Sequence, residues 1–469
     1  REYDVFYAFK IHINQFLNKI GDIIVAASDF VCGYPLFILL VGGGLFFLIY
    51  SRFIPFRGFK YAIDSLKHSE MGKQGQISSF EALATPIAAT VGMGNIAGVA
   101  IALSIGGPGA IFWMWVSAIL GMSTKFFEGT LSVLYKGKDS NGELQGGTMY
   151  MITEGLGKKF KPLAIFFALS GLIGTACFMQ SNQLTEAYLT VFPVDGNQHI
   201  VKLLSGTIIC ILVSIVVLGG IKRIAKVASK LTPLMVVLYF LLVFYIICTH
   251  LESIPGVFAS IFKGAFTIKA GVGGGIGGLI AIALTGIRRA ALVNEAGVGT
   301  ASIMHGASKN KEPIREGLVA MLGPSIDSGL VCTLTAIAIL IQSDLIPQGG
   351  MSSVEGLRVA ITTFDASMPG VGKYLLLIIV TIFAFSTMFS YSFYGQKCTG
   401  FIFGAKYEKY YVYYFLATLI LAAVVPLKAI VSLVDLSYGL MAFPTMITMF
   451  ILAPKAKALM NEFFNANKK

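Results

Sequence analysis

The chain has 469 residues, of which 55% are hydrophobic and only 13% are charged. Soluble domains of this length do not have such a composition, so we expect a membrane protein that crosses the lipid bilayer many times. The formal net charge of +12 could indicate a nucleic-acid-binding protein. However, lysines and arginines gather in alternate loops between apolar runs, which is the positive-inside pattern. We therefore expect no nucleic-acid partner, an N-terminus outside the cell and a C-terminus in the cytoplasm.

Residues 1–30 mix apolar and charged side chains, which is typical of an amphipathic helix at a membrane surface. Beyond them, apolar runs recur to the end of the chain, and they predict an all-α polytopic protein with about eleven transmembrane helices. We place these spans near Tyr34–Tyr50, Phe80–Ile105, Gly109–Leu134, Leu163–Phe192, Leu203–Leu218, Leu231–Cys248, Phe266–Ile287, Leu318–Ile341, Tyr374–Phe403, Val412–Val425 and Ile430–Leu452.

The second of these spans contains Gly92, Gly94 and Asn95 at its middle. A helix in lipid should not be loosened there, because each freed backbone group must find a new partner. Such a sequence indicates either a helix break that lines a cavity or a glycine-rich face for close helix packing.

A second glycine-rich stretch, Lys269–Leu279, opens the seventh span and is too rich in glycine to remain helical throughout. Five spans begin with each break, and an odd number of spans inverts a repeat. The spacing therefore predicts two inverted five-helix repeats at residues 78–250 and 260–454, preceded by one extra span at 31–55 and followed by a tail at 455–469. Paired broken helices in corresponding positions point to the binding site of a secondary transporter.

The sequence does not contain the residue patterns that are typical of metal, disulfide or nucleotide sites. The six cysteines lie in or beside apolar runs without CxxC spacing, the five histidines do not cluster, and no Gly-Lys-Ser/Thr phosphate loop is present. We expect no cofactor, no direct use of ATP and no enzymatic chemistry on a substrate.

Several sequence motifs resemble those of the alanine/glycine:cation symporters, also called the sodium:alanine symporter family. They are Gly94–Ala100, Gly106–Trp115, Val293–Ala301, Ala384–Thr387 and Tyr391–Gly395. This family is built on the fold of the bacterial leucine transporter, with two inverted five-helix repeats. The resemblance implies sodium-coupled uptake of a small neutral amino acid, alanine or glycine, by alternating access. It also implies the cytoplasmic membrane of a bacterium or archaeon, with sodium as the coupling ion.

In that setting, the N–H groups of Gly92, Met93 and Gly94 and the amide of Asn95 can donate to a substrate carboxylate. Gln180, in the fourth span, offers an acceptor for the ammonium group and donors for the carboxylate, although an interhelical hydrogen bond is the alternative. The other wall of the pocket would come from the ring of Tyr391 and the carbonyls of three glycines of the second break, Gly273, Gly274 and Gly275.

Sodium is a hard cation that prefers several oxygen ligands. Ser386 and Thr387 supply adjacent hydroxyls, and the resemblance implies that the carbonyls of Ala88 and Val91 complete the shell. The alternative for the two hydroxyls is a hydrogen bond to their own helix.

Ionisable residues inside spans are functional candidates by default. Asp327 could contribute to a second cation site or make a hydrogen bond between helices. Asp435 is a candidate gate residue, and Glu295 could belong to a cytoplasmic gate network beside Arg288 and Arg289. For Glu128 we expect a local ion pair with Lys125.

Two departures from the family pattern concern specificity, since Met93 stands where the family often has a small polar residue and Tyr391 where it usually has a tryptophan. Two other functions remain alternatives: a proton-coupled transporter of the same fold and an amino-acid receptor that does not transport. The sequence defines neither the enantiomer that is bound nor an oligomeric state.

Overall fold

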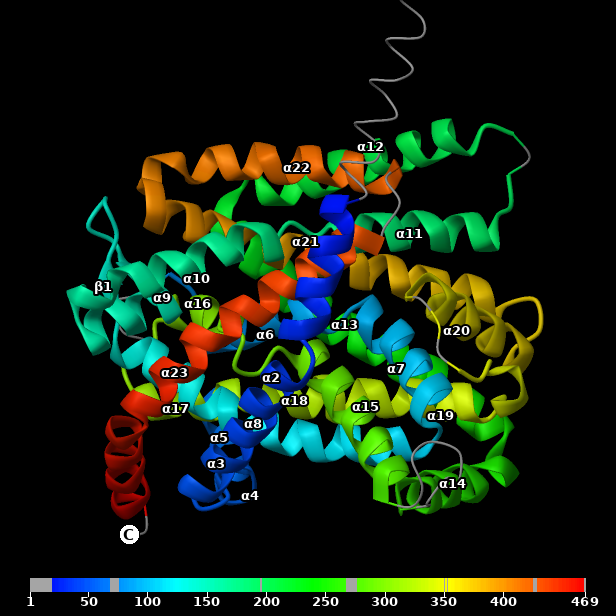
Figure 1. Ribbon diagram of the computed structural model, residues 1–469, viewed down its shortest axis with the longest axis horizontal. Coiled ribbons are helices and arrows are strands. Elements are labelled where there is room, and N and C mark those ends of the chain that lie inside the picture. Colours follow the sequence, from blue (N-terminus) through cyan, green and yellow to red (C-terminus); the bar gives the residue numbers. More distant parts are fainter. Residues whose placement is uncertain are drawn as a thin grey trace, which may run out of the picture.

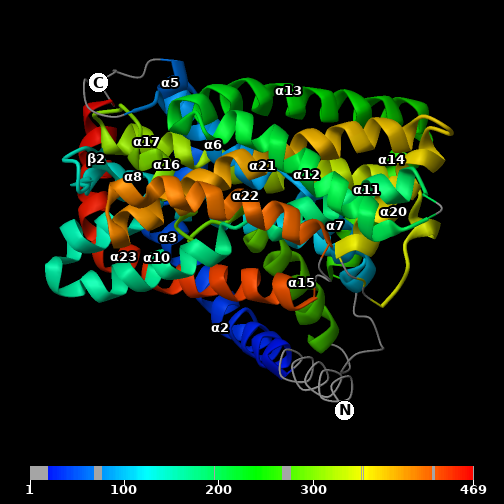
Figure 2. The ribbon, with the colours of Figure 1, turned by 90° about the horizontal axis from the view of Figure 1, so that it is seen from above.

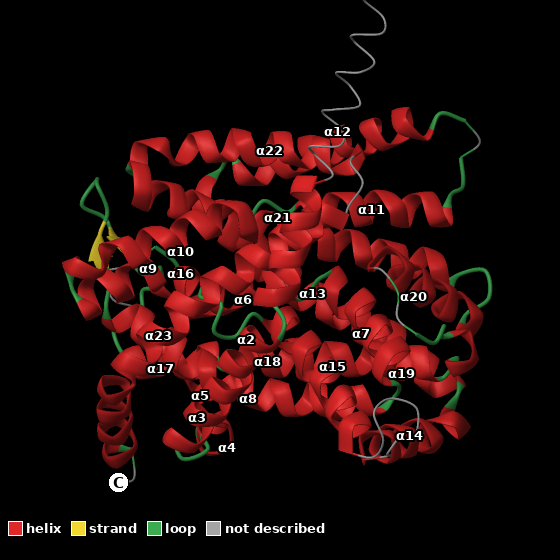
Figure 3. Ribbon diagram, viewed as in Figure 1, coloured by secondary structure: helices red, strands yellow, loops and turns green. Residues whose placement is uncertain are grey.

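The computed structural model describes residues 19–67, 76–194, 196–266, 276–349, 351, 353–424 and 428–467. Helices dominate these residues (Figure 3), and the strands are confined to the short antiparallel hairpin of β1 (Gly137–Lys138) and β2 (Leu144–Gln145). Glycines 273, 274 and 275, which the sequence assigned to the pocket wall, lie outside the described residues.

Within the described ranges, eight helices are long and apolar enough to cross a membrane, and a bent pair raises this to nine. The predicted count of about eleven is therefore not confirmed. Helices are present at the two remaining positions, but α15 (Ile276–Asn294) carries two arginines near its end and α22 (Glu408–Val424) has only 17 residues. The eight are Lys19–Tyr50, Gly109–Leu134, Lys158–Val191, Gln198–Val217, Gly220–Thr249, Pro313–Leu340, Gly372–Phe403 and Ser432–Ala466.

The helices fall into two sets of five, and each set begins with a broken helix. An N-terminal segment precedes them, with α2 (Tyr34–Phe37), a π-helical turn (Ile38–Gly42), α3 (Gly43–Tyr50), α4 (Ile54–Arg57) and α5 (Phe59–Lys67). The first set contains α6 (Ser79–Thr90) with α7 (Met93–Gly106), α8 (Gly109–Leu134), α10 (Lys161–Gly174) with α11 (Phe178–Val191), α12 (Gln198–Val217) and α13 (Gly220–Thr249). The second contains α15 with α16 (Thr300–Gly306), α17 (Pro313–Ala320) with α18 (Leu322–Pro324) and α19 (Cys332–Leu340), α21 (Gly372–Phe403), α22 and α23 (Lys428–Ala466). Shorter helices between them are α9 (Thr148–Tyr150), α14 (Ile254–Phe266) and α20 (Ser353–Ser367).

The packing of these helices has an internal symmetry. The second helices of the two sets, α8 and α17, contact each other, and so do the fourth helices, α12 and α22, which lie side by side at one edge (Figures 1 and 2). The third helix of each set packs on the fifth helix of the other, since α10 contacts α23 and α21 contacts α13. Equivalent helices of the two sets therefore make equivalent contacts, as expected for structural repeats.

The close approach of α8 and α17 depends on glycine. A Cβ at Gly317 would lie 2.6 Å from the Phe126 carbonyl oxygen, and a Cβ at Gly129 would lie 2.6 Å from the Ala320 Cβ. Small residues let two backbones approach closely where lipid provides no hydrophobic driving force.

The first predicted break is present. Helix α6 starts with a capping box, in which Ser78 and Glu81 bond each other's backbone N–H groups, and it ends at Thr90. Helix α7 starts at Met93, and the pair is bent by 47°.

A second break separates α15 from α16, at residues 295–299. Three residues there have left-handed backbone conformations, with φ of +51° at Glu295, +86° at Gly297 and +99° at Gly299. The predicted break at Lys269–Leu279 falls largely on residues 267–275, which lie outside the described ranges, whereas the chain from Ile276 is helical. The second break that the structure describes therefore follows α15 rather than opening it.

Candidate functional site

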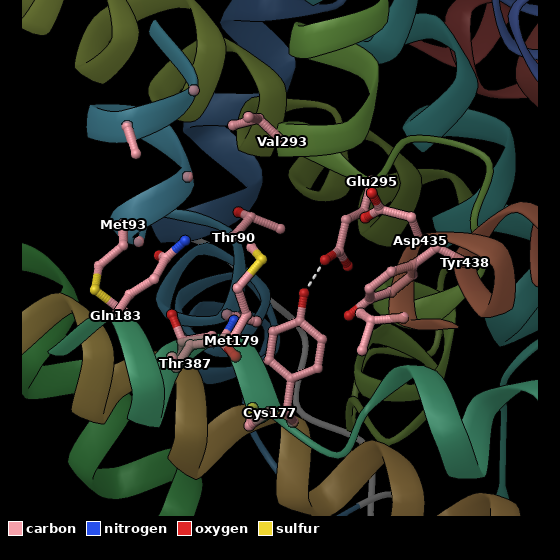
Figure 4. Close-up of a pocket in the computed structure, with 18 of the residues that line it drawn as sticks. Thr90, Met93, Cys177, Met179, Gln183, Val293, Glu295, Thr387, Asp435 and Tyr438 are labelled. Atoms are coloured by element: carbon pink, nitrogen blue, oxygen red, sulfur yellow. Dashed lines mark hydrogen bonds between the residues drawn. The ribbon is translucent and has the colours of Figure 1, made fainter. Parts of the chain in front are cut away.

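A cavity of about 160 Å³ lies between the two breaks. This volume is sufficient for several water molecules or one small organic solute. Its walls come from the α6/α7 break, the start of α11, the end of α15, the middle of α21 and the start of α23 (Figure 4).

Most of the predicted substrate residues line this cavity. Those brought together are Gly92, Met93, Gly94, Gln180 and Tyr391, with Thr387 of the predicted sodium site and the acidic residues Glu295 and Asp435. Met93, Met179 and Val293 supply apolar surface, so the cavity wall is mixed in character (Figure 4).

Asn95 is placed differently from the expectation. It is fully buried and does not line the cavity; its Oδ1 accepts from Gly92 N at 2.9 Å, and its amide nitrogen donates to Asp327. The Gly92 N–H and the Asn95 amide are therefore engaged within the protein, whereas the backbone at the start of α7, at Met93 and Gly94, lines the cavity.

Asp327 lies in a π-helical turn, Ser325–Val331, between α18 and α19. One carboxylate oxygen accepts from Asn95, whereas Oδ2 has no hydrogen-bond partner among the described residues. The structure thus contains the interhelical hydrogen bond and also an oxygen with spare acceptor capacity.

Residues of the predicted sodium site converge at the C-terminal end of α6. Ser386 Oγ donates to Ala88 O at 3.1 Å, and Thr387 Oγ1 donates to the same carbonyl at 3.3 Å. Ser386 Oγ also contacts Phe383 O in its own helix, at 2.9 Å. Val91 directly follows α6, where the last carbonyls of a helix lack intrahelical partners. Backbone and hydroxyl oxygens of two helices thus meet at one point, as a hard cation requires.

Glu295 lies at the second break, and its side chain reaches the cavity (Figure 4). Its carboxylate accepts from Tyr391 OH and, at 2.6 Å, from Thr300 Oγ1. The left-handed backbone at this non-glycine residue costs about 1–2 kcal/mol, which the surrounding contacts must offset.

Glu128 holds the backbone of the same break. Its two carboxylate oxygens accept from Ser302 N at 3.0 Å and from Gly297 N at 3.2 Å. The predicted partner Lys125 is 3.9 Å away, so an ion pair forms, but the backbone contacts are closer.

Sequence reasoning missed Gln183, Thr90 and Cys177, which also line the cavity. Gln183 Nε2 has no hydrogen-bond partner within the described structure. The available signal was helical spacing, because Gln183 follows Gln180 by three residues and so shares a face of α11 with it.

The cavity extends toward one side only of the two breaks. Along α7 it reaches Ala97, Gly98 and Ile101, and along α15 it reaches Val293 and Arg289. Its lining includes only the last turn of α6 and no residue of α16.

The opposite side is closed by a polar cluster around Glu316 of α17. One carboxylate oxygen contacts His305 Nδ1 at 2.7 Å, and the other accepts from Ser79 Oγ and Ser308 Oγ, both at 2.9 Å. A parallel bridge between Ile77 and Ser308 joins the chain before α6 to the chain after α16. We call Ser79, His305, Ser308 and Glu316 the α6–α17 cluster.

The sequence profile of the sodium:alanine symporter family matches residues 17–469. The chain belongs to this family. Its members are membrane transporters rather than enzymes. Two curated relatives differ in the solute that their names state. The sodium/alanine symporter AgcS of Methanococcus maripaludis is 36% identical over 91% of this chain and 93% of that protein. The probable sodium/glutamine symporter GlnT of Bacillus subtilis is 31% identical over 95% of this chain and 91% of that protein.

Among solved structures, the crystal structure of MhsT in complex with L-phenylalanine matches with a TM-score of 0.56 at 14% identity. The match covers 83% of this family member and 99% of MhsT. At this identity it concerns the fold alone, and it confirms the expected fold of the bacterial leucine transporter.

Proposed function

We propose that this family member is a sodium-coupled symporter that imports a small neutral amino acid, alanine or glycine, by alternating access. The observation that carries the proposal is the cavity between two helix breaks, with the oxygens of Ala88, Ser386 and Thr387 beside it. A broken pair of helices provides both a helix N-terminus for an anionic group and free carbonyls for a cation.

In this proposal, the N–H groups of Met93 and Gly94 at the start of α7 bind the substrate carboxylate, aided by the helix dipole. Gln180 adds polar contacts. Sodium replaces the hydroxyl hydrogen bonds at Ala88, with Ser386, Thr387 and the carbonyl of Val91 as further ligands. The cytoplasm would lie on the side of the α6–α17 cluster, which agrees with the basic loops of the sequence.

The substrate assignment rests on the apolar side chains of Met93 and Met179 in the cavity wall. Apolar surface of this kind suits the methyl group of alanine better than the polar amide of glutamine, the solute for which one relative is named. We therefore expect uptake to fall when the side chain of the amino acid becomes longer or polar.

Uptake of labelled alanine into proteoliposomes tests the proposal, with an inward sodium gradient, with sodium on both sides, and without sodium. We expect accumulation only with the gradient. The double variant Ser386→Ala with Thr387→Ala should lose the accumulation driven by the sodium gradient, because two sodium ligands are removed. Ser390→Ala is the matched control, since it removes a hydroxyl that bonds only its own helix, at Ser386 O. Binding without accumulation would identify a receptor and overturn the transport proposal.

Proton coupling is the second candidate, because Asp327 Oδ2 is buried without a hydrogen-bond partner in the described chain. Accumulation driven by a pH gradient in the absence of sodium, and lost in Asp327→Asn, would select it.

A further inference from the structure

One buried carboxylate in the cavity wall, that of Glu295, forms no ion pair with the described side chains. Glu295 is only 5% exposed, and no Lys, Arg or His nitrogen of the described chain lies within 4 Å of its oxygens. Arg289 also lines the cavity and is engaged in an interaction, but it forms no ion pair with Glu295. A buried charge without a partner of opposite sign is strongly unfavourable.

Burial disfavours the ionised form of Glu295, whereas its hydrogen-bond donors favour it, so a cation in the cavity would stabilise the charged carboxylate. Both of its hydrogen bonds come from hydroxyl donors, Tyr391 OH and Thr300 Oγ1, and both oxygens retain a lone pair. These donors fix the direction of the carboxylate, which reaches the wall of the cavity (Figure 4).

The opposite wall of the cavity presents donors. The N-terminus of α7 begins at Met93, and Gln183 Nε2, on the side of the cavity across from Glu295 in Figure 4, has no partner among the described residues. The cavity is therefore dipolar, with donors at one end and a carboxylate at the other. An amino-acid zwitterion has the complementary arrangement, with its carboxylate and ammonium groups separated by one carbon.

We propose that the Glu295 carboxylate is the counter-ion of the substrate ammonium group, and that Gln183 donates to the substrate carboxylate. The inference rests on the proposed function and defines the substrate class more narrowly. The substrate must carry a free α-ammonium group, and an acid that lacks this positive charge is rejected because Glu295 would remain buried without a counter-ion.

Lactate is the probe for this charge, because it keeps the carbon skeleton and carboxylate of alanine but carries a hydroxyl in place of the ammonium. Binding of labelled alanine to the purified full chain, with sodium in excess, is competed with unlabelled alanine and with lactate. For the wild type we expect alanine to bind at least about 100-fold more tightly than lactate, since a site built for one polar group discriminates strongly against its absence.

In Glu295→Gln we expect alanine affinity to fall by about 10- to 100-fold and the preference over lactate to fall with it. Glu128→Gln is the matched control, because Glu128 bonds the same break but does not line the cavity. It should change the affinities for both ligands by the same factor and so preserve their ratio. Gln183→Leu should weaken alanine and lactate together, since both carry the carboxylate.

The outcomes separate the inference from the proposed function. If the wild type binds no small amino acid in sodium, the proposed function fails and the inference fails with it. If the wild type binds alanine but Glu295→Gln keeps its full preference over lactate, only the inference is overturned. Equal loss of both ligands in Glu295→Gln, together with a shifted sodium requirement, would also overturn it by assigning Glu295 to the cation. The ratio of alanine and lactate affinities of the wild type tests the inference even if Glu295→Gln does not fold. If lactate binds as tightly as alanine, the inference is contradicted.

Discussion

The two sides of the paired breaks are built differently. On the side of α7 and α15, the cavity lies between helices whose lining residues are mostly small or apolar, with Arg289 as the exception. On the side of α6 and α16, buried polar groups join the segments through the α6–α17 cluster. Helices that pack through small residues can slide or separate at a small cost in free energy. A buried carboxylate that accepts several hydrogen bonds loses all of them together when the segments separate. The closed side therefore depends on the few groups of the α6–α17 cluster, and single substitutions in that cluster test the difference between the two sides.

The largest effect on stability is expected from Glu316→Gln, which removes hydrogen bonds of the α6–α17 cluster. The substitution leaves one carbonyl oxygen for the donors of Ser79, Ser308 and His305, so at least one buried donor loses its partner. We expect a loss of about 3 kcal/mol in stability, measured as a lower midpoint of thermal denaturation in detergent.

The control for this variant is Glu312→Gln, at the exposed start of the same helix, where the ion pair with Arg315 should contribute less than about 1 kcal/mol. Equal effects of the two substitutions would show that the buried cluster does not hold the closed side.

A second substitution tests the wall of the cavity on the side of α7 and α15. Met93→Ala removes a side chain from the cavity wall without touching the cluster, so the preference for alanine over valine should fall by about tenfold, as expected for a few methylene groups in a pocket. Competition binding in sodium measures this ratio. Met149→Ala removes an equally buried methionine that does not line the cavity, and it should leave the ratio unchanged. A changed ratio in the control would mean that the selectivity does not come from the wall at Met93.

The smallest effect is expected from Ser79→Ala, which deletes one of the donors to Glu316 and leaves the carboxylate with the others. We expect about 1 kcal/mol of destabilisation, again by thermal denaturation. In Ser65→Ala the lost hydroxyl bonds only a carbonyl of its own helix, and the change should be smaller. If Ser65→Ala lowers the midpoint of thermal denaturation more than Ser79→Ala does, the contact between α6 and α17 contributes nothing to stability.

Much of the fold followed from the sequence, because hydropathy and the glycines at Gly92 and Gly94 are strong local signals. The order of the helices and the first break were predictable in this way. The second break was not, since the run Gly273–Gly275 is more conspicuous than the chain at Glu295–Gly299. That break is fixed by tertiary contacts, in which Glu128 from α8 accepts from the N–H groups of Gly297 and Ser302.

The site was predictable to the level of the helix but not of the side chain. Gln180 lines the cavity as expected, but the sequence could not distinguish its direction from that of Gln183, one turn later. Asn95 was assigned to the substrate because a polar residue in an apolar span suggests a ligand contact. Its partner Asp327 lies 232 residues away in the chain, and only the fold brings the two together.

The bond from Gly92 N to Asn95 Oδ1 has a consequence for the energetics of binding. Asn95 N also donates to Gly92 O at 3.1 Å, so the interrupted backbone is tied to its own next turn in both directions. The conformational entropy of the break is thus lost when the chain folds, and an arriving solute does not have to order it again. A preorganised break of this kind lets a ligand with few atoms bind with useful affinity.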